Sequence, residues 1–186
     1  MVLTCRVRGE VPVPDGIPPI QAAVGLDRAP VAIDDEGEAR WLEACVWPDQ
    51  RNRLERLHGA LALGREVGLD VRRGDAVADT PALVREVAAH GHPVVTNSWV
   101  LNYFTTDDRV AYLHMLGRPA RKRDLSWVYV ESPAQIGGLP APEQEPERTV
   151  LSLVRWRGGR RYVDHLATCH PHGNCTGTDE RQAAPK

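Results

Sequence analysis

The chain has 186 residues, of which 42% are hydrophobic and 26% charged, and its net charge is −2. This is the composition of an ordinary globular protein, and no basic face argues for a nucleic-acid partner. No apolar run is long enough to span a bilayer and no basic-then-apolar leader is visible, so we expect a cytoplasmic protein without a membrane partner.

The first half of the chain alternates between strand and helix patterns. A short strand is predicted in "VLTCRVRGEVPVP", and a second in "IQAAVGLDRAP", which ends at Gly25-Leu26-Asp27. A helix is predicted from Glu38, and Pro48 separates it from a second helix. "LDVRRGDA" then predicts another short strand, which ends at Gly74-Asp75.

The second half continues this alternation and ends in a hairpin. Thr80-Pro81 begins a predicted helix, the valine pair of "HPVVTNS" forms a strand, and Thr106 is the predicted cap of the next helix. "LSWVYV" predicts a strand that ends at Glu131. "TVLSLVRW" and "RRYVDHLA" flank Gly158-Gly159, a strong signal for a two-residue hairpin turn. The polar tail, 177–186, is predicted to be disordered.

Strands that alternate with helices predict a mostly parallel sheet flanked by helices, with an antiparallel hairpin at its C-terminal end. We therefore expect one α/β domain over 1–176. Three strands end in an acid, Asp27, Asp75 and Glu131, and a fourth ends in Asn97-Ser98. Because the carboxyl ends of parallel strands meet in one crevice, these side chains are predicted to bind a ligand together. Alternatively, each acid caps the helix or turn that follows it.

A segment rich in histidine and cysteine, "TCHPHGNC", follows the last strand pattern. Its residues invite a zinc site, but Pro171 separates the histidines and no second cluster matches them. We therefore predict no metal, and expect His170 and His172 to form a hydrogen-bonding turn or a proton-transfer group. The four cysteines of the chain are too scattered for a disulfide framework and are expected to be reduced.

Two tryptophans, Trp41 and Trp47, flank the helix break before Pro48. We predict that they pack in the core, with stacking on a ligand as the alternative. No nucleophile elbow, P-loop or Gly-x-Gly-x-x-Gly motif is present in the sequence.

Several segments resemble an uncharacterised actinobacterial family, a domain of unknown function. The likeness begins at "ARWLEACVWPDQRNRLERLHGAL" and includes "GLDRAP", "RRGDA", "VVTNSWVLNY", "WVYVESP" and "PHG". Members of this family look methyltransferase-like and are longer, with a glycine-rich cofactor loop in an N-terminal half that this chain lacks. The resemblance implies an incomplete Rossmann-like sheet, a second chain that supplies the N-terminal half of the fold, and S-adenosylmethionine as a candidate cofactor.

The strand ends and the resemblance together predict a pocket. Glu131, Asn97 and His172 are its predicted catalytic residues. The predicted binding residues are Asp27, Asp75, Ser98, Trp99, Asn102, Tyr103 and His170. This sequence departs from the family pattern at Asn97, where the family has histidine, at Trp99 and Asn102, where small residues are expected, and at Asn174, where an aromatic is expected. Such substitutions imply a changed reaction, or none.

Three functions remain open. In the first, the chain is a subunit of a heteromeric, small-molecule-modifying enzyme of actinobacterial specialised metabolism, which transfers a methyl group with Glu131 or a histidine as general base. In the second, no cofactor is used and the site closes an aziridine ring with loss of sulfate, with donors from Arg72, Arg73, Asn97 and Asn102. In the third, the chain is a non-catalytic partner that stabilises or regulates another subunit. An incomplete sheet exposes an apolar edge, so we expect poor solubility for the chain expressed alone.

Overall fold

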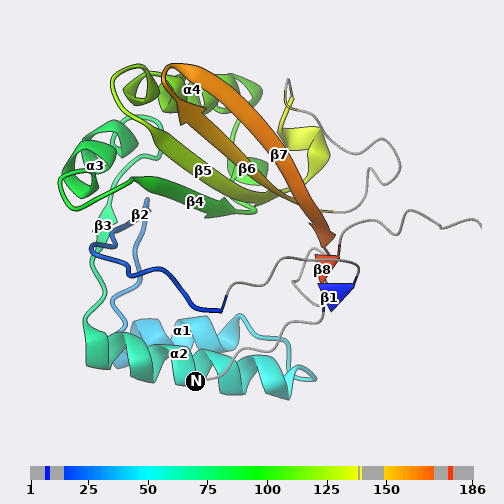
Figure 1. Ribbon diagram of the computed structural model, residues 1–186. Coiled ribbons are helices and arrows are strands. Elements are labelled where there is room, and N and C mark those ends of the chain that lie inside the picture. Colours follow the sequence, from blue (N-terminus) through cyan, green and yellow to red (C-terminus); the bar gives the residue numbers. More distant parts are fainter. Residues whose placement is uncertain (1–6, 9–14, 138, 140–148, 170–175, 178–186) are drawn as a thin grey trace, which may run out of the picture. The chain divides into compact units, whose positions relative to one another are not determined.

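A computed structural model describes residues 7–8, 15–137, 139, 149–169 and 176–177 (Figure 1). These residues form two compact units, each described by itself below. The first unit contains Ala23–Thr80, and the second contains the described residues before Ala23 and those from Pro81 onward. The single domain over 1–176 stays a prediction, and the tail beyond Gly177 lies outside the described residues.

The first unit combines two short parallel strands with two helices. Its elements are β2 (Gly25–Asp27), α1 (Glu36–Ala44), α2 (Arg51–Val67) and β3 (Val71–Arg73). The predicted strand end at Asp27 is thus confirmed, whereas β3 ends at Arg73, one residue before the predicted end at Gly74-Asp75. β2 pairs in parallel with β3, with Gly25 opposite Val71, and the two helices form the connection that parallel strands require.

The tryptophans of the first unit are exposed. Trp41 and Trp47 expose 66% and 70% of their surface, so the prediction that they pack in the core is wrong. α1 buries Ala39 instead. Trp41 follows two residues later, and two residues rotate a side chain by about 200° around a helix, which places it on the opposite side.

The second unit contains a six-stranded sheet. Its strands are β1 (Val7–Arg8), β4 (Val94–Ser98), β5 (Leu125–Glu131), β6 (Thr149–Arg157), β7 (Arg160–Cys169) and β8 (Thr176–Gly177). Its helices are α3 (Thr80–Val87), whose first residue is the last of the first unit, and α4 (Thr106–Gly117). The short 3-10 turns are η1 (Leu101–Tyr103), η2 (Pro119–Arg121) and η3 (Pro133–Gln135). The order of the strands in the sheet is β1-β8-β7-β6-β5-β4.

This sheet is mixed, and the prediction that it is mostly parallel is wrong. Among the described strands, the β4–β5 and β1–β8 pairs are parallel, whereas β5–β6, β6–β7 and β7–β8 are antiparallel. β6 pairs directly with β5 in the antiparallel direction, with Leu125 opposite Trp156, so the sheet grows beyond β5 without a parallel crossover. The predicted hairpin is confirmed, because Gly158 and Gly159 join β6 to β7 with φ angles of 55° and 77°, as a two-residue turn requires.

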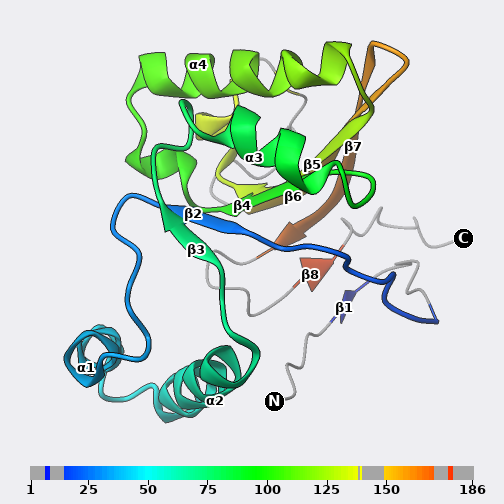
Figure 2. The ribbon, with the colours of Figure 1, turned by 90° about the vertical axis from the view of Figure 1, so that its left-hand side faces the viewer.

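The core of the second unit lies on the face of the sheet that α4 covers (Figure 2). Leu125, Trp127, Tyr129 and Glu131 alternate along β5 and all point to this face, where each is fully buried. From α4, the ring of Tyr112 packs edge-on against Trp127, with 6.0 Å between the ring centroids. The last of these buried side chains, at the carboxyl end of β5, is therefore the carboxylate of Glu131.

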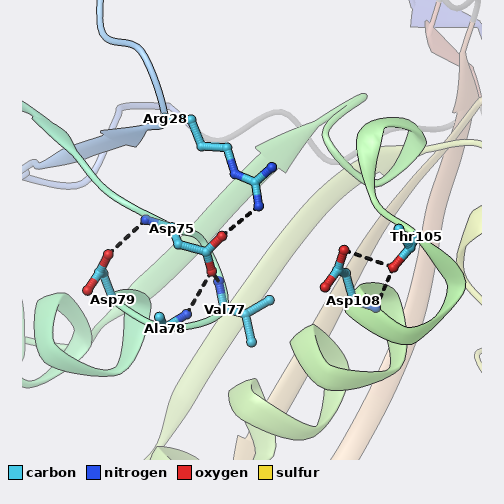
Figure 3. A network of polar contacts seen from close by, with 7 residues as sticks. All are labelled: Arg28, Asp75, Val77, Ala78, Asp79, Thr105 and Asp108. Atoms are coloured by element: carbon cyan, nitrogen blue, oxygen red, sulfur yellow. Dashed lines mark hydrogen bonds and ion pairs between the residues drawn. The ribbon is translucent and has the colours of Figure 1, made fainter.

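α4 begins one residue earlier than predicted. Thr105, not Thr106, is the cap, and its hydroxyl oxygen accepts a hydrogen bond from the backbone N–H of Asp108 at 3.1 Å (Figure 3). The same hydroxyl donates to the Asp108 carboxylate at 2.8 Å, so the two side chains cap the first turn together. α4 ends at Gly117, as the sequence predicts.

Candidate functional site

Glu131 is the centre of the candidate site. Its side chain is fully buried at the carboxyl end of β5. Oε1 accepts hydrogen bonds from Asn97 Nδ2 at 2.7 Å, from the backbone N–H of Val100 at 2.9 Å and, more weakly, from that of Leu101 at 3.4 Å. Oε2 is also buried, and it has no hydrogen-bond partner among the described residues. One carboxylate oxygen is thus anchored and the other is open to a further group.

Burial raises the pKa of Glu131 above its ordinary value. The loss of water disfavours the charged form, and the three donors to Oε1 offset this effect only in part. A carboxyl group with a raised pKa holds its proton closer to neutral pH, which is what a general acid or base requires.

Asn97, at β4, connects Glu131 to the aromatic core. Its Oδ1 accepts hydrogen bonds from Trp127 Nε1 at 2.5 Å and from the Tyr112 hydroxyl at 3.4 Å. Because both neighbours are donors, Oδ1 must face them and Nδ2 must face Glu131. Burial, and then the charge of Glu131, raise the pKa of Tyr112, so its hydroxyl stays protonated as a donor. The hydrogen bonds from Tyr112 and Trp127 therefore fix the orientation of the Asn97 amide, whose Nδ2 donates to Glu131.

The turn after β4 brings two backbone donors to the same oxygen. Trp99 has a φ of 57°, the one left-handed conformation of a residue other than glycine in the described part of the chain. This conformation is unfavourable for a bulky side chain, and such backbone strain is concentrated at functional sites. The backbone N–H of Trp99 donates to Val130 O at 3.0 Å, and the next two N–H groups donate to Glu131.

Further buried polar atoms without partners gather at this end of the sheet. Trp99 and Asn102 follow β4, Glu131 ends β5, Gln135 lies in η3, and Thr149 begins β6. Since β4 and β5 are parallel and β6 is antiparallel to them, all these positions belong to the same end of the three strands. At this end of the sheet, the buried atoms that find no partner in the described residues are Trp99 Nε1, Asn102 Nδ2, Glu131 Oε2, Gln135 Oε1 and Thr149 Oγ1; the Tyr129 hydroxyl, further back along β5, is another such atom. Buried polar atoms are normally paired, and no described residue pairs with these, so they are available to a ligand or ordered water.

The predicted site residues separate into three sets. Glu131, Asn97, Trp99 and Asn102 belong to the buried polar group just described. Ser98 and Tyr103 belong to the same segment but are exposed, Tyr103 by 88%, so they do not contribute to the buried group. His170 and His172 lie outside the described residues, and their predicted roles stay predictions.

The third set, Asp27 and Asp75, belongs to the first unit. Asp27 Oδ1 accepts from the N–H of Ala29 at 2.8 Å. Asp75 Oδ1 accepts from Val77 N at 2.9 Å and from Ala78 N at 3.0 Å, and its Oδ2 forms an ion pair with Arg28 at 2.8 Å (Figure 3). The hydrogen bond from Arg28 is the main cause that lowers the pKa of Asp75.

The expectation that four polar strand ends meet in one sheet is therefore wrong. β2 and β3 form their own two-stranded sheet, apart from the sheet that contains β4 and β5. Asp27 and Asp75 cap turns, which is the alternative that the sequence left open, and their ligand-binding roles stay predictions.

Sequence reasoning missed four contributors to the site: Tyr112, Trp127, Gln135 and Thr149. A signal existed for Trp127 alone, because it shares the strand face of Glu131 at a spacing of four residues. The part of the chain that the structure describes contains no group of three or more histidine, cysteine or acidic side chains able to hold a metal ion. Within the same residues, no helix is long and apolar enough to cross a membrane.

Residues 1–176 match the model of the DUF2332 family, described as an uncharacterized protein conserved in bacteria. The chain belongs to this family. No curated protein and no solved structure matches this chain. The bacterial family of unknown function is thus confirmed, whereas methyltransferase likeness has no support from these comparisons.

Proposed function

We propose that this DUF2332 protein is a component of an enzyme that modifies a small molecule, and that Glu131 transfers a proton in the reaction. One observation carries the proposal: a fully buried carboxyl group has one oxygen held by three donors and the other without a partner among the described residues. A purely structural carboxylate is expected to use both of its oxygens.

The arrangement suits a general base. With Oε1 held, Oε2 can accept a proton from an amine or hydroxyl of a bound molecule, and the raised pKa matches that task. The side-chain N–H donors of Trp99 and Asn102, which have no partner among the described residues, can bind an acceptor on the same molecule. We expect the substrate to carry both a donor, for Glu131, and an acceptor, for these two side chains.

Methyl transfer is the more specific form of this proposal. In that reaction the protein mainly aligns a nucleophile with the methyl group, and Glu131 removes the proton of the nucleophile. The parallel β4–β5 pair with its polar carboxyl end supports a Rossmann-like ancestry for this part of the sheet. S-adenosylmethionine is then the cofactor to test first.

A partner chain is the second part of the proposal. β4 is the last strand of its described sheet, and Val94 in it is 50% exposed. Unpaired strand edges invite pairing, and proteins normally cover them. The alternative function, a non-catalytic partner subunit, is favoured by the structural use of Oε1, which fastens the turn after β4.

A gene replacement tests these functions and does not require an identified substrate. The gene is deleted, and the strain is complemented with the native chain, with Glu131→Gln or with Glu55→Gln, an exposed control on α2. Glutamine keeps an acceptor for the three donors but cannot take up a proton, so we expect a loss of product of roughly a hundredfold or more. Small molecules are compared by mass spectrometry, and partners of each tagged chain are identified after purification.

The outcomes separate the alternatives. Loss of a product with Glu131→Gln, but not with Glu55→Gln, supports the enzyme if both variants retain the same partner. Full activity of Glu131→Gln excludes proton transfer by this residue and leaves the non-catalytic subunit. Calorimetry of the purified complex with S-adenosylmethionine decides the cofactor, and no heat of binding removes the methyl-transfer form.

A further inference from the structure

The second unit carries a cluster of seven exposed cations, here called the basic hairpin patch. Its members are Arg118, Arg121, Lys122, Arg123, Arg157, Arg160 and Arg161, and all seven are exposed. They come from two segments, 118–124 and 157–161, which together hold one acidic residue, Asp124. These twelve residues carry a net charge of +6, whereas the whole chain carries −2.

The fold joins the two segments. Leu125 in β5 pairs with Trp156 in β6, so the residues before β5 lie opposite the turn that connects β6 to β7. The backbone N–H of Gly158 in that turn donates to Asp124 Oδ1 at 3.0 Å. Figure 2 shows this turn beside the end of α4, from which the first segment continues. The one acidic residue of the two segments, Asp124, is therefore hydrogen-bonded to the backbone of the turn.

The patch is not neutralised within the described residues. None of its seven side chains forms an ion pair there, while the neighbouring Arg155 does pair with Asp164, at 2.5 Å. Like charges this close repel each other, and together they concentrate anions at the surface. An anionic partner with repeated charges removes the repulsion and gains one contact from each cation.

We propose that the basic hairpin patch binds the phosphate backbone of a nucleic acid. Of the apolar side chains within or next to its two segments, Ala120, Leu125 and Trp156 are buried, whereas Tyr162 is 45% exposed. The exposed part therefore offers cations, the glycine turn and a single tyrosine ring, which is too little for an apolar core. Protein partners are bound through an apolar core within a polar rim, which this patch lacks. Nucleic-acid interfaces are more polar and more positive, and a two-stranded ribbon fits the major groove of DNA. The net charge of the chain conceals this surface, because acidic residues elsewhere outweigh it.

Fluorescence anisotropy of the full chain with labelled DNA and RNA duplexes of arbitrary sequence tests the proposal. We expect binding at about 50 mM salt that weakens steeply by about 200 mM, because each neutralised phosphate releases counterions. The two duplexes identify which nucleic acid presents the backbone. Vesicles that contain anionic lipid serve as the competing polyanionic surface.

The decisive variant is Arg157→Gln/Arg160→Gln/Arg161→Gln. It removes three charges at the hairpin turn, and we expect affinity to fall by roughly tenfold or more at low salt. The matched control, Arg51→Gln/Arg53→Gln/Arg56→Gln, removes three exposed charges from α2 and should change affinity by less than about twofold. Circular dichroism confirms that both variants are folded. No binding to either duplex, equal loss in the two variants, or binding to vesicles alone overturns the proposal.

Discussion

The two units place acidic side chains at the ends of their strands, yet the acids have different surroundings. In the first unit, Asp75 keeps 39% of its side chain exposed and bonds to nearby backbone N–H groups and to Arg28. In the second, Glu131 has no exposed surface, and one of its oxygens has no partner in the described residues. Water stabilises an exposed carboxylate, whereas a buried one needs donors or a proton. Burial, more than position at a strand end, makes Glu131 the candidate for chemistry.

The largest effect is expected from Glu131→Ala. This change leaves the Nδ2 of Asn97 and two backbone N–H groups buried without their acceptor, so we expect a loss of about 3 kcal/mol in the free energy of unfolding. Chemical denaturation measures it, with the exposed Glu55→Ala as control. A loss equal to that of the control means that the site is not buried as described.

Asn97→Ala is expected to have the next largest effect. It removes the acceptor of Trp127 Nε1 and the Nδ2 donor to Glu131, which costs about 2 kcal/mol. Its neighbour Ser98 is exposed, so Ser98→Ala should stay within about 0.5 kcal/mol. Similar losses from the two variants, measured by denaturation, contradict the bridging role of Asn97.

The pH dependence of stability distinguishes the two kinds of acid. Burial raises the pKa of folded Glu131 above 4.5, so the folded state binds this proton more tightly than the unfolded state. The stabilisation is fully present below the unfolded pKa and is lost as the pH rises through the folded pKa. We therefore expect the native chain to lose stability relative to Glu131→Gln as the pH rises from 4.5. Denaturation of both chains across this range measures it, and parallel curves show that the pKa is not raised.

The smallest effect is expected from Asp75→Ala in the first unit. The change removes the acceptor of two backbone N–H groups and an exposed ion pair, so we expect a loss of about 1 kcal/mol. Asp49→Ala, at an exposed position in the same unit, is the control. If Asp75→Ala destabilises as much as Glu131→Ala, the contrast between exposed and buried acids fails.

Much of the local structure follows from the sequence. The period of two in "LSWVYV" predicts β5, and Gly158-Gly159 predicts the β6–β7 turn that the structure contains. Glu131, Asn97, Trp99 and Asn102 were recognisable as candidates because they follow strand patterns. These signals are local, since turn geometry, helix caps and strand alternation depend on residues a few positions apart.

The tertiary structure decided what lies next to these elements. It assigned Asp27 and Asp75 to a sheet of their own, and it made the larger sheet mixed, because strand pairing joins segments far apart in the chain. It also exposed Trp41 and buried Glu131, although both are large side chains in regular elements. Glu131 depends on Asn97, which is 34 residues away, and Asn97 depends on Trp127, which is 30 residues away. The sequence by itself determines which polar residues end the strands; long-range packing decides which of them lose water, and so which can act chemically.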